Sequence, residues 1–179
     1  PAVGGGTLRD LLVGGERSPP FVFSDPNYMY IVLAVVAVGT LLSRGVTFPK
    51  VVRERFEGIL FVADTIGLAA FTVIGAKVAI VANLDWFWVP ICAAITCAGG
   101  GVILDVVTAR EPRTFRGEPY EEIAIMGGLL LVAILVLAET VGVSEMLVGG
   151  AVLVTMIFVF SLRALAVYRG WRVPLLGRT

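Results

Sequence analysis

Residues 4–16 read GGGTLRDLLVGGE, and residues 99–111 read GGGVILDVVTARE. Each segment begins with three glycines and has an aspartate six residues after the first glycine, Asp10 in one and Asp105 in the other. Each also ends in a glutamate, and the two segments are offset by 95 residues. We call them the first and the second glycine segment. Their match indicates that the chain contains an internal repeat.

The composition indicates that the chain is a membrane protein. Of the 179 residues, 58% are hydrophobic and only 16% are charged, and the mean hydropathy is +0.93. A soluble domain of this length could not cover its surface with so few polar side chains. The balanced charge gives no indication of nucleic-acid binding, and the absence of histidine removes the usual metal ligand and general base. We expect Cys92 and Cys97 to be small apolar fillers, because on a helix their spacing suits neither a disulfide nor a metal pair.

Five apolar stretches have the length of a membrane-spanning helix. They cover residues 28–43, 59–82, 86–108, 123–139 and 143–168. Residues 1–13 are too short to span and are typical of the second part of a helix that begins earlier. The glycine triplets predict breaks inside the helices that carry them.

The charged loops set an orientation. Ten basic residues fall in three segments that helix counting places on one side: Arg44, Lys50, Arg53, Arg55, Arg110, Arg113, Arg116, Arg169, Arg172 and Arg178. The opposite loops contain Arg17 alone. By the positive-inside rule, the C-terminus is predicted to be cytoplasmic.

The repeat unit has three helices, so its two copies must cross the membrane in opposite directions. The predicted organisation is therefore a partial first repeat over 1–43, a cytoplasmic loop over 44–58, a second inverted repeat over 59–139, and an additional helix with a cytoplasmic tail over 143–179. Such inverted repeats place interrupted helices near the midplane of the membrane.

Two interpretations of the triplets Gly4, Gly5, Gly6 and Gly99, Gly100, Gly101 are open. Glycine lowers helix propensity by about 1 kcal/mol relative to alanine, and freed carbonyls facing a watery cavity would be good cation ligands. Small residues also allow close helix packing. Because the triplets occupy matched positions, we favour a pore constriction.

Ionisable side chains inside membrane spans normally face a protein interior or a cavity. Arg9 and Asp10 could form a structural ion pair, and Asp105 would then need Lys77 or Arg9 as a partner. Asp64 lies near a helix end, where an interfacial position would explain it. Lys77 and Arg163 are both near enough to an interface to snorkel.

The pattern Asp64-x-x-Gly67-x-x-x-Phe71-x-x-x-Gly75-x-x-x-Ala79, followed by Gly99–Gly101 and Asp105, resembles the trimeric intracellular cation (TRIC) channel family in its prokaryotic branch. Gly4, Gly5, Gly6, Thr7, Leu8, Arg9 and Asp10 match the first glycine-rich kink of that family. Two departures are expected. The first family helix is missing here, and Leu104 stands where many prokaryotic relatives repeat the arginine.

The resemblance implies an all-α membrane fold of seven helices, in two inverted three-helix repeats plus one. It also implies a homotrimer with a pore in each protomer that passes monovalent cations such as K⁺, with Lys77 as a gating charge. The alternative is a secondary transporter of a small zwitterion such as glycine. The expected ligands are transported K⁺ or Na⁺ and bound membrane lipid, with no cofactor. An enzyme is disfavoured, because even the paired aspartates do not fit the GxGD pattern of intramembrane proteases.

Overall fold

The computed structural model describes residues 3–15, 19–43, 50–110, 117–140, 142 and 144–173, with the backbone alone at 42–43 and 50–57. All regular structure in these residues is helical, which confirms the predicted all-α class. The helices are α1 (Gly4–Val13), α2 (Phe21–Ser24), α3 (Pro26–Ser43), α4 (Lys50–Val81), α5 (Trp88–Val107), α6 (Glu121–Glu139) and α7 (Glu145–Tyr168).

Each of the five predicted spans coincides with a long helix, and their bounds agree within two residues except at the start of α4. Four segments are long and apolar enough to cross a membrane: Gly58–Val81, Trp88–Val107, Glu121–Glu139 and Glu145–Tyr168. The described apolar part of α3, Pro26–Leu41, is shorter. The short α2 falls in the connection between α1 and α3, where no helix is predicted.

The start of α4 corrects one boundary. A loop is predicted over 44–58, but α4 begins at Lys50 and continues into the apolar part without interruption. Residues 44–49 lie outside the described part of the chain. The sequence KVVRERFE at 50–57 contains no glycine or proline, and lysine, arginine and glutamate are good helix formers. Helical hydrogen bonding therefore continues beyond the apolar span.

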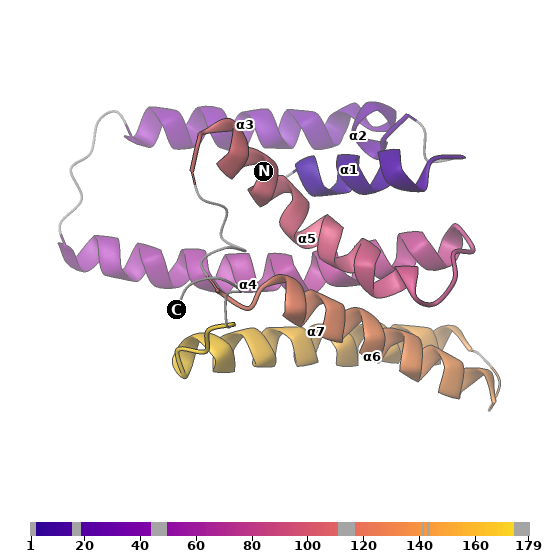
Figure 1. Ribbon diagram of the computed structural model, residues 1–179. Coiled ribbons are helices and arrows are strands. Elements are labelled where there is room, and N and C mark those ends of the chain that lie inside the picture. Colours follow the sequence, from indigo (N-terminus) through magenta and orange to yellow (C-terminus); the bar gives the residue numbers. More distant parts are fainter. Residues whose placement is uncertain are drawn as a thin grey trace.

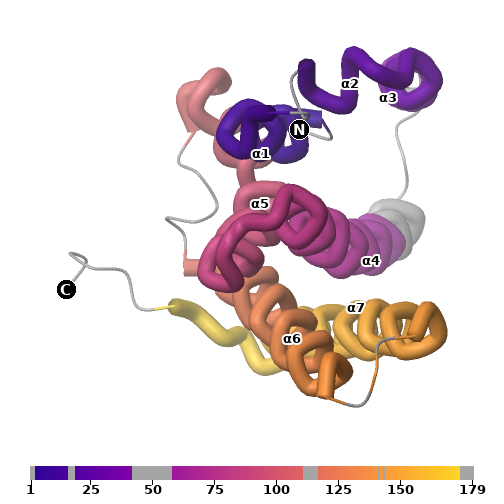
Figure 2. The backbone as a smooth tube through the Cα atoms, turned by 90° about the vertical axis from the view of Figure 1, so that its right-hand side faces the viewer, coloured from indigo at the N-terminus to yellow at the C-terminus, as the bar shows by residue number. Residues whose placement is uncertain are grey.

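The helices form three layers. Figure 2 shows α4 and α5 in the middle, with α1, α2 and α3 on one side and α6 and α7 on the other. Helix α5 packs against α1, α4 and α6, while α3 packs mainly against α2. Figure 1 shows α5 crossing obliquely between α1 and the lower layers. This central position of α5 brings the second glycine segment onto α1.

The expected break at the second triplet is wrong. Helix α5 is continuous from Trp88 to Val107 and includes all three glycines, although its ribbon changes direction along its length (Figure 1). Each glycine weakens a helix by about 1 kcal/mol, but packing against neighbouring helices outweighs local propensity. Helix α1 begins at Gly4, so the first triplet forms its first turn.

Small residues allow the middle and lower layers to pack closely. A Cβ built on Gly128 of α6 would lie 2.7 Å from Cα of Pro90 in α5, and one on Gly127 would collide with Val159 of α7. Among the described residues, Gly149 and Gly150 have no neighbour within 4 Å of such an atom. Gly127 and Gly128 therefore allow close packing between helices of this chain. The buried core nearby has the same character: Ala76, Ala79, Val89, Cys92, Ala93, Leu131 and Ala151.

Candidate functional site: the crossing of the two glycine segments

Helices α1 and α5 cross where the two glycine triplets meet. A Cβ built on Gly4 would lie 2.9 Å from Cα of Gly100, and one on Gly99 would lie 3.2 Å from Cα of Gly5. Gly4 corresponds to Gly99 and Gly5 to Gly100 by the 95-residue offset, so the two contacts are equivalent. The glycines therefore contact each other reciprocally, as a pseudo-two-fold axis through the crossing requires.

The neighbouring side chains follow the same symmetry. The Cβ position of Gly4 is 3.5 Å from Cδ1 of Ile103, and that of Gly99 is 3.4 Å from Cδ2 of Leu8. Leu8 and Ile103 are again 95 residues apart. Two independent pairs of contacts thus support the inverted repeat inferred from the sequence.

The crossing is densely packed around the first triplet. A Cβ on Gly5 would collide with the carbonyl oxygen of Thr96 and lie 2.8 Å from that of Ile95. A Cβ on Gly6 would be 2.6 Å from Cε1 of Phe21. Gly101, in contrast, has nothing within 4 Å of its Cβ position. Most of these contacts are those of helix packing, the alternative to a pore lining.

Arg9 and Asp10 form a buried ion pair within α1, and Arg9 also forms a hydrogen bond to α5. Nη2 of Arg9 lies 2.6 Å from Oδ1 of Asp10, and Nε donates to the same oxygen at 2.9 Å. Nη1 of Arg9 donates to Oγ1 of Thr96 at 3.3 Å, and the amide of Phe21 donates to Oδ2 of Asp10 at 3.0 Å. The Arg9 and Asp10 side chains are 4% and 0% exposed. This confirms the structural ion pair considered from the sequence.

Thr96 connects the two sides of α5. Its hydroxyl donates to the carbonyl oxygen of Cys92 at 2.6 Å while accepting from Arg9. On the other side, a Cβ on Gly75 of α4 would lie 2.6 Å from that hydroxyl oxygen. The threonine therefore occupies the point where α1 and α4 approach α5 most closely. Sequence reasoning missed it, because a threonine that bonds its own helix backbone gives no pattern.

The remaining predicted positions lie around this crossing. Oγ1 of Thr7 donates to the carbonyl oxygen of Val3 at 2.9 Å, so its hydroxyl is used within the first turn of α1. In the second glycine segment, Leu104 is 42% exposed and Asp105 is half-buried. Asp64 is exposed on α4 and accepts a hydrogen bond from Tyr120 at 3.5 Å. The crossing thus contains the triplets, Arg9 and Asp10, but not Asp64.

Lys77 points away from the packed side of α4. It is exposed, whereas Ala76, Val78 and Ala79 next to it are buried. Lys77 follows Ile66 by eleven residues and therefore shares its helix face to within about 20°. Ile66 lines a shallow apolar groove of about 540 Å³ together with Gly58, Ile59, Val62 and Ala63. Lys77 is thus at one end of an open face.

The small residues Gly67, Gly75 and Ala79 recur along α4, a pattern that favours helix packing, and the structure shows close packing at Gly75 and burial at Ala79. Gly75 approaches α5 so closely that its Cβ position is 2.7 Å from Cα of Ala93. Gly67 has only the Phe71 ring in reach, at 4.0 Å. The cysteines behave as expected: Cys92 and Cys97 are free, and Cys97 lies 3.4 Å from Oγ1 of Thr72.

Comparison with known proteins identifies the family. A family model described as "Glycine transporter" matches residues 1–44 and 61–137, more than half of the chain. The chain belongs to this family. Its fold is that of TRIC channels: a TRIC cation channel studied for its conductance superposes with a TM-score of 0.76 at 29% identity, covering 99% of this chain and 79% of that one. A TRIC channel orthologue from Rhodobacter sphaeroides gives 0.74 at 28% identity, covering 94% and 78%.

Curated relatives are bacterial membrane proteins. A UPF0126 membrane protein of Vibrio cholerae is 37% identical over 128 residues, which are 72% of this chain and 50% of that protein. YvgT of Bacillus subtilis is 32% identical over 73% of this chain and 60% of its own length. The chain thus spans between half and three fifths of these relatives. Together with its apolar spans, these matches make it a multi-pass membrane protein.

Proposed function

We propose that the protein is a channel for monovalent cations such as K⁺, with a conduit inside each protomer. The observation that carries this proposal is the match of nearly the whole chain to a solved TRIC cation channel at 29% identity. The reciprocal crossing of the glycine segments adds support, because inverted repeats that meet in this way are typical of membrane conduits. As in that family, the working assembly would be a homotrimer.

The proposed conduit runs beside the crossing rather than through its packed centre. Gly101 has free space next to its Cβ position, and the half-buried Asp105 lies four residues further along α5. A carboxylate favours cations over anions. Lys77, on the open face of α4, would be the charge that responds to voltage. From the positive-inside rule, the proposed orientation has the C-terminus in the cytoplasm.

A second candidate is a carrier of glycine or a similar small zwitterion. The description of the matching family model favours it. A carrier needs alternating access and shows saturable uptake, whereas a channel gives unitary currents. Uptake of labelled glycine into proteoliposomes therefore separates the two.

The test of the channel is a planar-bilayer recording of purified protein in asymmetric KCl. We expect single-channel currents whose reversal potential lies near the K⁺ equilibrium value. A reversal potential at the Cl⁻ equilibrium value would rule the proposal out, and saturable glycine uptake without unitary currents would favour the carrier.

Gly101 allows the pore interpretation of the triplets to be separated from packing. A side chain at Gly5 must disturb α1, so loss of current in such a variant says little about a pore. Gly101→Leu places a side chain in free space, and we expect it to lower unitary conductance without changing the thermal stability of the protein. Unchanged conductance in a stable Gly101→Leu protein would leave packing as the role of the triplets.

A further inference from the structure

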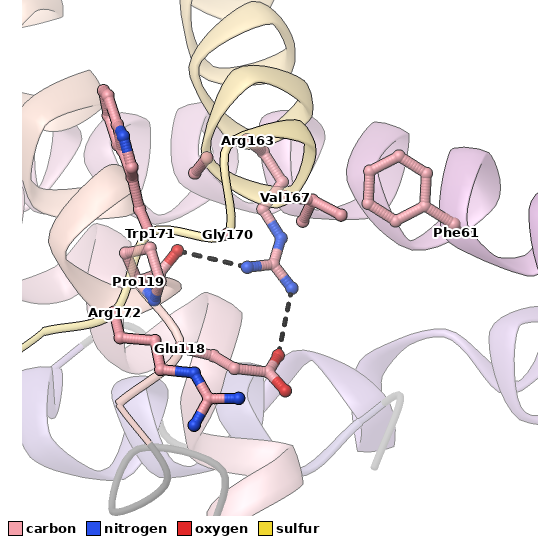
Figure 3. A pocket seen from close by; sticks show the side chains of 9 residues that line it. Phe61, Glu118, Pro119, Arg163, Val167, Gly170, Trp171 and Arg172 are labelled. Carbon is pink, nitrogen blue, oxygen red and sulfur yellow. Dashed lines mark hydrogen bonds and ion pairs between the residues drawn. The ribbon is translucent and has the colours of Figure 1, made fainter.

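A second site with charged residues lies at the end of the helix bundle. It is a cavity of about 600 Å³ between the start of the apolar part of α4, the segment that precedes α6, and the end of α7. Its lining residues are Phe61, Glu118, Pro119, Arg163, Ala166, Val167, Gly170, Trp171 and Arg172. Figure 3 shows the side chains around it.

Arg163 is the unusual member of this set. Its position in the last helix suggests snorkelling, but the structure shows the opposite: the residue is only 5% exposed and turns inward. Nη1 donates to the carbonyl oxygen of Pro119 at 3.3 Å, and the guanidinium lies 5.1 Å from the centre of the Tyr120 ring. Nε is buried without a hydrogen-bond partner among the described residues.

The protein only partly neutralises this buried charge. Nη2 of Arg163 is 3.4 Å from Oε2 of Glu118, a long ion pair whose carboxylate side chain is 53% exposed. Arg172 lines the same cavity, and Figure 3 shows its side chain among those around it. Two arginines against one exposed carboxylate leave the cavity with a net positive charge. A buried guanidinium with a long ion pair and an unpartnered Nε favours binding of an anion that accepts several hydrogen bonds.

The location narrows the class of anion. The cavity lies where the apolar spans end, near Gly58 of α4 and Tyr168 of α7, and Trp171 in its wall is a residue type that marks the membrane interface. Lipid phosphates lie at this depth. Arginine binds phosphate through its planar fork of donors.

We propose that this cavity binds a phosphate group through Arg163 and Arg172, with the Glu118 carboxylate displaced toward solvent. The phosphate could come from an anionic membrane lipid or from phosphate in solution, since the recognising chemistry is the same. The proposal does not depend on whether the protein conducts ions.

Trp171 provides the reporter, because it lines the cavity and the other two tryptophans, Trp86 and Trp88, lie at the start of α5. A protein carrying Trp86→Phe and Trp88→Phe is reconstituted into phosphatidylcholine vesicles that contain increasing fractions of brominated phosphatidylglycerol. Quenching of Trp171 then gives the binding constant of the anionic lipid relative to phosphatidylcholine. In uncharged detergent, the same protein is titrated with inorganic phosphate at constant ionic strength.

The decisive variant is Arg172→Gln, because Arg172 is exposed and its loss leaves the packing intact. We expect it to lower the relative binding constant about tenfold, the effect of one charge-assisted hydrogen bond. The matched control is Arg169→Gln, which removes an exposed arginine of the same segment that does not line the cavity. Arg163→Lys keeps the charge but loses the fork and should be intermediate.

Each outcome is informative. A preference for phosphatidylglycerol that Arg172→Gln abolishes and Arg169→Gln retains supports a lipid phosphate. A saturable response to inorganic phosphate with the same dependence on Arg172, and no lipid preference, supports a soluble phosphate. Equal effects of Arg172→Gln and Arg169→Gln, or no response to either probe, would overturn the site.

Discussion

The first and the second glycine segment have the same backbone crossing in different surroundings. In the first, Arg9 and Asp10 are 3% and 0% exposed and form an ion pair. In the second, Leu104 stands in place of the arginine and is 42% exposed, and Asp105, the counterpart of Asp10, is half-buried. The reciprocal glycine contacts show that the repeat preserves close helix approach. The charges next to the glycines can differ because the crossing itself does not depend on them.

The largest effect should follow from breaking the ion pair. Arg9→Met leaves the Asp10 carboxylate buried, with the Phe21 amide as its remaining hydrogen-bond donor among the described residues. Removing one partner of a buried pair costs about 3–5 kcal/mol. We expect a strongly lowered midpoint of thermal unfolding, measured by size-exclusion chromatography of heated detergent samples. Leu104→Met, the matched change in the second segment, should shift the midpoint little.

A double variant sharpens this comparison. Arg9→Met combined with Asp10→Leu removes both charges, and replacing a whole buried pair with apolar side chains is often neutral. Most of the stability should therefore return. If the double variant were as unstable as Arg9→Met, the contact of Arg9 with Thr96 rather than the ion pair would be the source of the loss.

The next effect concerns the triplets. Gly5→Ala places a methyl group against the Thr96 carbonyl oxygen, where the backbone cannot yield easily. Overpacking of this kind costs about 1–3 kcal/mol. Gly101→Ala enters open space and should be neutral or stabilise α5 by up to about 1 kcal/mol. Equal unfolding midpoints for the two alanine variants would contradict the tight crossing described here.

A smaller effect is expected at Thr96. Thr96→Val keeps the shape of the side chain but removes the hydroxyl that accepts from Arg9. The loss should be about 1 kcal/mol, the net contribution of a typical hydrogen bond, and it should be smaller in the Arg9→Met background, where only the bond of the hydroxyl to the Cys92 carbonyl oxygen is lost. A double-mutant cycle on unfolding midpoints measures this coupling. Additive effects would mean that Arg9 and Thr96 do not interact.

The smallest effect should come from α4, which packs on α5 through Gly75 and bears Lys77 on its open side. One charge across 100 mV corresponds to about 2.3 kcal/mol, so a side chain that senses a third of the field contributes roughly 0.7 kcal/mol. Lys77→Gln should therefore flatten the voltage dependence of open probability in bilayer recordings. Recordings that match the wild type would mean that Lys77 only extends to the membrane interface and does not sense voltage.

The sequence by itself determined the helical class, the spans and the repeat. Apolar stretches of membrane length are unambiguous, because lipid requires every backbone group to be bonded within a helix. The 95-residue offset between the triplets was sufficient to predict which glycines are related, and the structure adds that these residues contact each other across the crossing.

Only the tertiary structure decided what surrounds each residue. The third glycine of the triplet is enclosed by Phe21 at Gly6 and open at Gly101, because neighbours from other helices differ although the local glycine triplet does not. Arg163 is buried rather than snorkelling for the same reason: Pro119, Glu118 and Tyr120 come to it from a distant segment. Hydropathy depends on residue type alone, whereas burial and pairing depend on contacts between helices far apart in the chain.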